Sequence, residues 1–259
     1  MKRHLIFLVA ILILNVKCGV VAEELVFNTQ DFPPFNYTVD NKVEGPAADI
    51  IRAACQALSY SCKFKLLPWR RAINEVKEGK AHGLFVIGWN KERDQWLYYS
   101  PPLMETAYGF FVRKSNTLNY SGLKDIEGYR VGVFGPSNTS KSLEKIKQSM
   151  ESESLNAIHI KMVSDDINIF KMLDDPKRNL TSVYSNKDVG MAIIHQVNLG
   201  NIRYAGSHKK LNYYFGLSKE FTDKKVADAF SNTVSDMRNS GKLKEILDSY
   251  HMRLAPIDK

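Results

Sequence analysis

The stretch GLFVIGWNKER, residues 83–93, joins an apolar run to a short polar segment that ends in an arginine. The run 83–88 contains no polar side chain, which is typical of a strand buried on both faces. Arg93 follows at the edge of the predicted sheet. A guanidinium is planar and permanently charged, and its paired donors match the two oxygens of a carboxylate. The pattern indicates a carboxylate-binding arginine; an ion pair with an acid of the protein's own surface is the alternative.

Short apolar strands and amphipathic helices alternate around this stretch. Strands are predicted at 25–27, 64–66 and 83–88, and helices at 46–59 and 72–79. The order strand, helix, strand, helix, strand favours an open α/β sheet over an all-α or all-β domain.

A second run of the same kind follows, so the chain is predicted to hold two α/β units. Its expected elements are strands at 130–134, 157–163 and 189–194, helices from 137 and at 167–173, and two closing helices broken near Gly241. The segments 108–112 and 213–217 resemble strands by which the chain crosses between the units.

The predicted fold class is therefore α/β, with two lobes that are each an open α/β sheet, joined by two crossing hinge strands. Lobe 1 is expected to comprise residues 23–112 plus 211–259, and lobe 2 residues 113–210. A mature chain of more than 230 residues suits one large domain or two such lobes.

The first 22 residues predict a cleaved export signal. A basic start precedes an apolar run at 5–16, and small residues precede a cut after Ala22. The apolar run is shorter than the roughly 20 residues that a membrane-spanning helix needs. Cys18 raises the alternative of a lipid anchor, but Lys17 stands where such an anchor requires a small residue. We expect a soluble, exported mature protein.

Charge and cysteine content are consistent with export. Cleavage removes three basic residues and no acid, which lowers the net charge from +8 to +5. The remaining charges are dispersed, without a basic stripe interleaved with aromatics, so nucleic acid is not an expected partner. Cys55 and Cys62 remain as an even pair, which in an oxidising compartment predicts a disulfide. A metal site is the weaker alternative because no histidine cluster accompanies the pair.

Several short motifs occur in a specific order along the mature chain. The segment 32–35 is an aromatic-Pro-Pro-Phe loop, 90–93 ends in Arg93, 100–102 is Ser-Pro-Pro, and 123–135 leads into a Val-Gly-Val strand. In this order they resemble the bacterial periplasmic solute-binding proteins of family 3, the polar amino-acid branch. The resemblance covers essentially the whole mature chain.

This resemblance implies a monomeric periplasmic protein that holds a small solute in a cleft between two lobes. The lobes close over the ligand, which favours the closed state by contacting both. The expected ligand is a carboxylate-bearing solute, most simply an amino acid or a derivative. The expected partner is an ABC permease in the inner membrane, and no cofactor or metal is expected.

The resemblance also implies a set of ligand-binding residues. Arg93 would take the ligand carboxylate, completed from lobe 2 by backbone N–H groups of Thr139 and Ser140. These open a predicted helix, where free N–H groups and the helix dipole favour an anion, although an ordinary helix cap is the alternative. Gly88 and Asn90 match positions that bind the ligand's amino group.

Two aromatic residues and a histidine complete the expected set. Phe32 and Trp69 match wall positions, with core packing as the alternative for both. His195 is expected at the end of the predicted strand 189–194, where relatives place an aspartate that pairs with the ligand's ammonium group. A neutral imidazole supplies no fixed negative charge, so the identity of the ligand stays open.

Two other functions are compatible with this resemblance. Some dehydratases that act on cyclic prephenate-like acids are similar in fold, but the expected cleft offers His195 and no placed glutamate, so catalysis is not expected. Similar domains also act as sensors, in which case this chain would dock on a separate membrane receptor.

Overall fold

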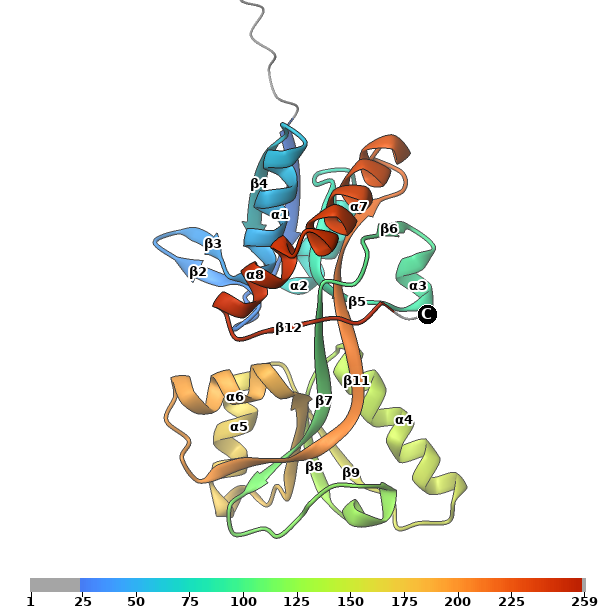
Figure 1. Cartoon of the computed structure of the whole chain (residues 1–259). Helices are drawn as coiled ribbons and strands as arrows, with labels where there is room; N and C mark the ends of the chain where they lie inside the picture. Colours follow the sequence, from blue (N-terminus) through green and yellow to red (C-terminus); the bar gives the residue numbers. More distant parts are fainter. Residues whose placement is uncertain (1–23, 258–259) are drawn as a thin grey trace, which may run out of the picture.

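Two α/β lobes lie one above the other in the computed structural model, which describes residues 24–257 (Figure 1). The predicted signal at 1–22 lies outside the described residues. Two long strands join the lobes, β7 (Met104–Arg113) and β11 (Ile202–Ser218), and they pair with each other in antiparallel register. The predicted crossing segments fall within these strands, so the predicted fold class is confirmed. The exact lobe boundaries, at 112/113 and 210/211, stay a prediction.

The first lobe contains parallel strands connected by helices. Its elements are β1 (Glu24–Thr29), β2 (Tyr37–Val39), β3 (Lys42–Glu44), α1 (Pro46–Ala57), β4 (Ser61–Leu66), α2 (Trp69–Lys77), β5 (Gly83–Gly88), α3 (Lys91–Asp94) and β6 (Leu97–Tyr99), and the chain returns to it with α7 (Lys224–Asn239), α8 (Lys242–Ser249) and β12 (Arg253–Leu254). Strand β1 pairs in parallel with both β4 and β5. The predicted break between the last two helices is confirmed at Gly241, whose φ of 84° suits glycine.

The second lobe repeats this arrangement. Its elements are η1 (Leu123–Ile126), β8 (Arg130–Phe134), α4 (Asn138–Ser152), β9 (His159–Val163), α5 (Asp166–Asp174), η2 (Pro176–Arg178), β10 (Ser182–Asn186) and α6 (Lys187–Gln196). Strand β8 pairs in parallel with β9 and β10.

One hydrogen-bonded sheet runs through both lobes in the order β4-β1-β5-β11-β7-β10-β8-β9. The end of β5 lies beside the hinge, where Gly88 pairs with Tyr213, and the end of β10 does too, where Asn186 pairs with Tyr108. In open α/β sheets, ligands bind beyond the carboxyl ends of parallel strands. The topology thus brings the ligand-binding edge of each lobe to the same place, between the lobes.

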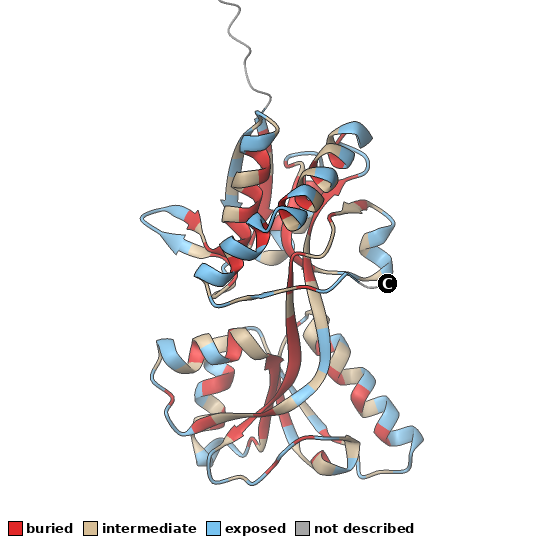
Figure 2. Ribbon diagram, viewed as in Figure 1, coloured by how far each residue is buried: buried red, intermediate tan, exposed pale blue. Residues whose placement is uncertain are grey.

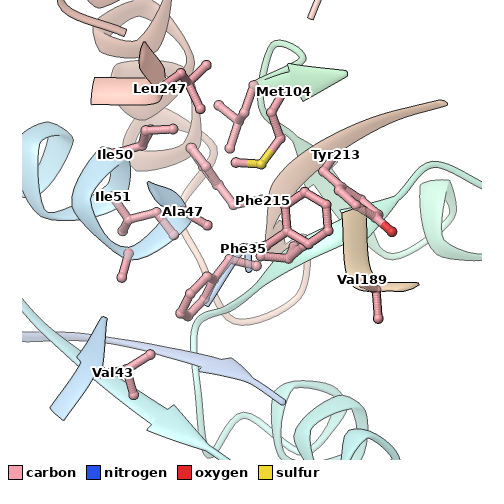
Figure 3. Packing of buried hydrophobic residues seen from close by; sticks show 14 of the residues in the cluster. Phe35, Val43, Ala47, Ile50, Ile51, Met104, Val189, Tyr213, Phe215 and Leu247 are labelled. Atoms are coloured by element: carbon pink, nitrogen blue, oxygen red, sulfur yellow. The ribbon is translucent and has the colours of Figure 1, made fainter. Parts of the chain in front are cut away.

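Aromatic packing holds the core together close to this edge. In lobe 1, Phe27 contacts Phe215 and Phe230 with ring centroids 6.2 and 5.9 Å apart. Phe35 packs edge-on against the hinge residue Tyr213 at 4.9 Å (Figure 3). Strand β7 is buried along almost its whole length, whereas β11 includes exposed residues (Figure 2). The hinge is therefore anchored on one strand and open to solvent on the other.

One predicted element is wrong. Residues 189–194 form part of helix α6, and the neighbouring strand is β10, immediately before it. Six apolar residues fit either a strand or a buried helix face. Asn186 decides between them, because its side chain accepts hydrogen bonds from the N–H groups of Asp188 and Val189 and so begins a helix.

The predicted disulfide is confirmed. It joins Cys55 in α1 to Cys62 in β4, with the two Cα atoms 6.2 Å apart. Within residues 24–257, no helix combines the length and the apolar character needed to cross a bilayer.

Candidate functional site

Arg93 lies in the short helix α3, directly after the buried strand β5. Asn90 caps this helix, since its Oδ1 accepts from the Arg93 N–H at 2.8 Å. The Arg93 side chain turns back toward the sheet, where its Nη1 donates to the Gly88 carbonyl at 3.0 Å. The guanidinium carbon lies 5.2 Å from the centre of the Trp69 ring, at cation–π distance. Contacts within lobe 1 therefore hold the guanidinium in place.

Arg93 forms no ion pair with an acid in the part of the chain that the structure describes. Among the described residues, no aspartate or glutamate oxygen lies within the 4.0 Å of an ion pair with its guanidinium, although other arginines such as Arg52 and Arg71 do form such pairs. Burial lowers the pKa of Arg93, and the neighbouring groups Tyr99, Tyr108 and Glu92 oppose that shift. A guanidinium stays protonated at physiological pH even so. A half-buried cation without an anion is costly, and a ligand carboxylate would offset that cost.

The N-terminus of helix α4 faces Arg93 from lobe 2. Across the cleft, Asn90 Nδ2 donates to Asn138 Oδ1 at 3.3 Å. The lobes are thus in contact at this point. Ser137 caps the helix by accepting from the Ser140 N–H at 3.0 Å, and the Ser140 hydroxyl accepts in turn from the Ser137 N–H at 2.9 Å. The Ser140 N–H is therefore engaged in the cap, whereas Thr139, at the second helical position, has no intrahelical acceptor for its N–H.

Two hinge tyrosines form the wall between Arg93 and lobe 2. Tyr108 and Tyr213 are both buried, and burial raises the pKa of each hydroxyl, so both stay neutral. The Tyr108 hydroxyl interacts with the side chains of Thr139 and Tyr213. Sequence reasoning missed these tyrosines as site residues because it placed them only as parts of crossing strands; their position at those crossings was the available signal.

The strand end of lobe 2 is occupied by Asn186, and the prediction that His195 stands there is wrong. His195 is exposed in the last turn of α6, the end remote from the hinge, because the chain forms a helix from Lys187 onward. Asn186 is 2% exposed, and its Nδ2 donates to the Tyr213 hydroxyl at 2.9 Å. Its amide is neutral, so Asn186 itself supplies no negative charge.

The two predicted wall aromatics differ in their roles. Phe32 packs on Phe35 and Tyr213, with centroids 5.5 and 6.0 Å apart, and it also lines a cavity between the lobes. Trp69 begins helix α2 and places its ring against Arg93. The assignment of Phe32, Trp69, Gly88, Asn90 and the other predicted residues to a ligand stays a prediction.

Two cavities flank this cluster, one on each side of the hinge. The cavity on the α4 side measures about 460 Å³ and is lined by Gly88 and Asn90 among others. The cavity on the α5 side measures about 290 Å³ and is lined by Phe32, Asp31 and Asp166 among others. Burial, and then the neighbouring Asp165, raises the pKa of Asp166 to about 7. The two sides of the cleft are therefore chemically different.

Comparisons with known proteins agree with this architecture. A histidine kinase sensor domain with similarity to periplasmic binding proteins superposes with a TM-score of 0.77 at 19% identity, covering 91% of this chain and 99% of its own. A Streptococcus mutans structure described for glutathione import scores 0.78 at 19% identity, with 91% and 98% covered. An ancestral arginine-binding protein bound to arginine scores 0.73 at 20% identity, with 88% and 97% covered. No curated protein matches.

At these identities the structural likeness shows the fold, and the sequence profile of a family goes further. The profile of the bacterial extracellular solute-binding proteins, family 3, matches residues 25–253, nearly all of the part that the structure describes. The chain belongs to the bacterial extracellular solute-binding proteins of family 3.

Proposed function

We propose that this protein binds a small carboxylate-bearing solute, an amino acid or a derivative of one, in the periplasm and delivers it to an ABC importer. One observation carries the proposal: a half-buried guanidinium without an acidic partner among the described residues, at the place where the two lobes meet. An anion placed there gains a charge-assisted interaction in a partly desolvated site.

The neighbouring groups indicate how a carboxylate would be held. Arg93 supplies the cation from lobe 1, and the start of helix α4, with the Thr139 N–H, supplies dipole and donor from lobe 2. The ligand would contact both lobes at once, so it would favour the closed arrangement. Binding and closure are then one event.

An ammonium group on the ligand would find its counter-charge on the α5 side of the cleft. Asp31 of lobe 1 and Asp166 of lobe 2 line the same cavity there. The neutral Asn186 cannot replace them in this role. We therefore propose that these two carboxylates, rather than a residue at the strand end, face the ligand's amino group.

The test is a thermal-shift and calorimetric screen of the mature protein against amino acids and small carboxylates, repeated with Arg93→Ala. The matched control is Arg70→Ala, an exposed arginine on helix α2 that makes no hydrogen bond or ion pair to another described residue. A ligand at 100-fold its Kd stabilises the folded state by about 2.7 kcal/mol. We expect this stabilisation to vanish in the Arg93 variant and to persist in the control. Equal responses in both variants would refute Arg93 as the anchor.

A second candidate function is ligand sensing, because a histidine kinase sensor domain shares this fold. The same clamp would then present its closed form to a membrane receptor instead of a permease. Uptake of the labelled ligand separates the two functions in cells that lack this gene. Lost uptake supports delivery, whereas normal uptake with a lost transcriptional response to the ligand supports sensing.

A further inference from the structure

The cavity on the α4 side of the cleft is strongly basic. Four lysines line it: Lys141 and Lys145 on helix α4, and Lys209 and Lys210 on hinge strand β11. Glu92 is the only acidic residue among the described ones that line it. Sequence analysis did not find this cluster, because the four residues come from segments that are more than sixty positions apart.

Two of these lysines have no counter-charge among residues 24–257. Lys141 lies 3.8 Å from Glu92, and Lys210 lies 3.5 Å from Glu105. Lys145 and Lys209 form neither an ion pair nor a side-chain hydrogen bond with any residue in the range 24–257. They also line a second hollow of about 440 Å³ next to the first, so they stand on the ridge between two cavities. An anion in either hollow would meet both ammonium groups.

The basic cavity adjoins the proposed carboxylate site through two residues that interact with Arg93. Its lining includes Gly88, whose carbonyl accepts the hydrogen bond from Arg93. It also includes Tyr108, which interacts electrostatically with Arg93. Trp89 also lines the cavity, and with 57% of its surface exposed it offers an apolar face there. The volume of about 460 Å³ falls within the range of small-molecule sites.

We infer that the solute carries at least two acidic groups: one on Arg93 and a second that lies in the α4-side cavity near Lys145 and Lys209. This inference rests on the proposed function and narrows it to a dianionic or polyanionic class, such as an acidic amino acid or an acidic short peptide. Lys145 belongs to lobe 2 whereas Arg93 belongs to lobe 1. The second acidic group therefore draws the lobes together, and dianions are favoured over their monoanionic analogues.

The test is isothermal titration with pairs of ligands that differ in one charge. Glutamate is compared with glutamine, glutarate with its monoamide, and γ-glutamylglutamate with γ-glutamylglutamine. The variant is Lys145→Gln/Lys209→Gln. The control is Lys161→Gln/Lys171→Gln, which removes the same charge from exposed positions of lobe 2 that line neither cavity.

We expect at least one dianion to bind the native protein about tenfold or more tightly than its amide, with an affinity that falls as salt rises. The Lys145/Lys209 variant should reduce that preference to about twofold or less, and the control should retain it. Equal affinity for each acid and its amide in the native protein would overturn the inference. A preference that survives in the variant would also overturn it.

The proposed function fails separately from this inference. If Arg93→Ala abolishes binding of an amide and the Lys145/Lys209 variant leaves the affinity for each acid and amide unchanged, only the second acidic group is refuted. If Arg93→Ala leaves binding intact, the anchor itself is wrong. If no acid or amide of the panel binds at millimolar concentration, both proposals are contradicted.

Discussion

Asp166 makes the stability of the unliganded protein depend on pH in a direction that can be predicted. It opens helix α5 and faces the cavity between the lobes. Burial, with a smaller effect of Asp165, raises its pKa from 3.8 to about 7. The folded protein therefore holds this proton more tightly than the unfolded chain does. The stability that Asp166 gains from holding this proton is fully present below about pH 4 and is lost as the pH rises through about 7.

The size of this effect follows from the difference in pKa. Three pH units correspond to at most ~4 kcal/mol. Because Asp166 is only half-buried and sits in the first turn of a helix, solvent and the helix dipole reduce the penalty, and we expect about 2 kcal/mol. Asp166→Asn removes the titrating group and keeps its shape. The variant should match the native protein at pH 4 and exceed its free energy of unfolding by about 2 kcal/mol at pH 8.

Urea unfolding at pH 4, 6 and 8, without ligand, measures this difference directly. The control is Asp236→Asn, which removes an exposed carboxylate from helix α7 and should leave the pH profile unchanged. If the Asp166 variant and the native protein have the same free energy of unfolding at all three pH values, the assignment of the raised pKa to Asp166 is refuted. A variant that is less stable than the native protein at pH 8 would refute it too.

Two further predictions concern the framework of the lobes. Replacing both Cys55 and Cys62 by serine opens a short loop and should lower the free energy of unfolding by about 2–3 kcal/mol in urea titrations; an unchanged midpoint would show that the crosslink contributes nothing. Gly190→Ala in helix α6 would place a Cβ 2.2 Å from a ring atom of Phe111, so a loss of about 1–3 kcal/mol is expected. Gly122→Ala, where no atom lies within 4 Å of the new Cβ, serves as the control, and equal stability of the two variants would contradict this account of the packing.

The order of strands and helices was largely predictable, because each element carries its own hydrophobic period and its own end signals. The helix from Pro46, the strand at 130–134 and the break at Gly241 all appear as expected. The run 189–194 was misassigned because a short apolar segment has no distinctive period. The cap at Asn186 was the overlooked local signal.

For the site, too, residues close together in the sequence could be predicted, whereas contacts between distant segments could not. Gly88, Asn90 and Arg93, at or just after the end of β5, were predicted together, and in the structure Arg93 donates hydrogen bonds to the other two. Tyr108 and Tyr213 were not, since their shared wall exists only where two hinge strands pair.

The sequence by itself determined the two α/β units and the arginine at a strand end, because these depend on periodicity and spacing within about a dozen residues. It also determined the family, because short motifs follow one another in a specific order along the chain. Only the tertiary structure decided which charges meet. The absence of an acidic ion-pair partner for Arg93 among residues 24–257, and the convergence of Lys145 with Lys209, depend on how distant segments of the chain pack together. Electrostatic interactions act through space over several ångströms, so distances along the chain do not reveal them.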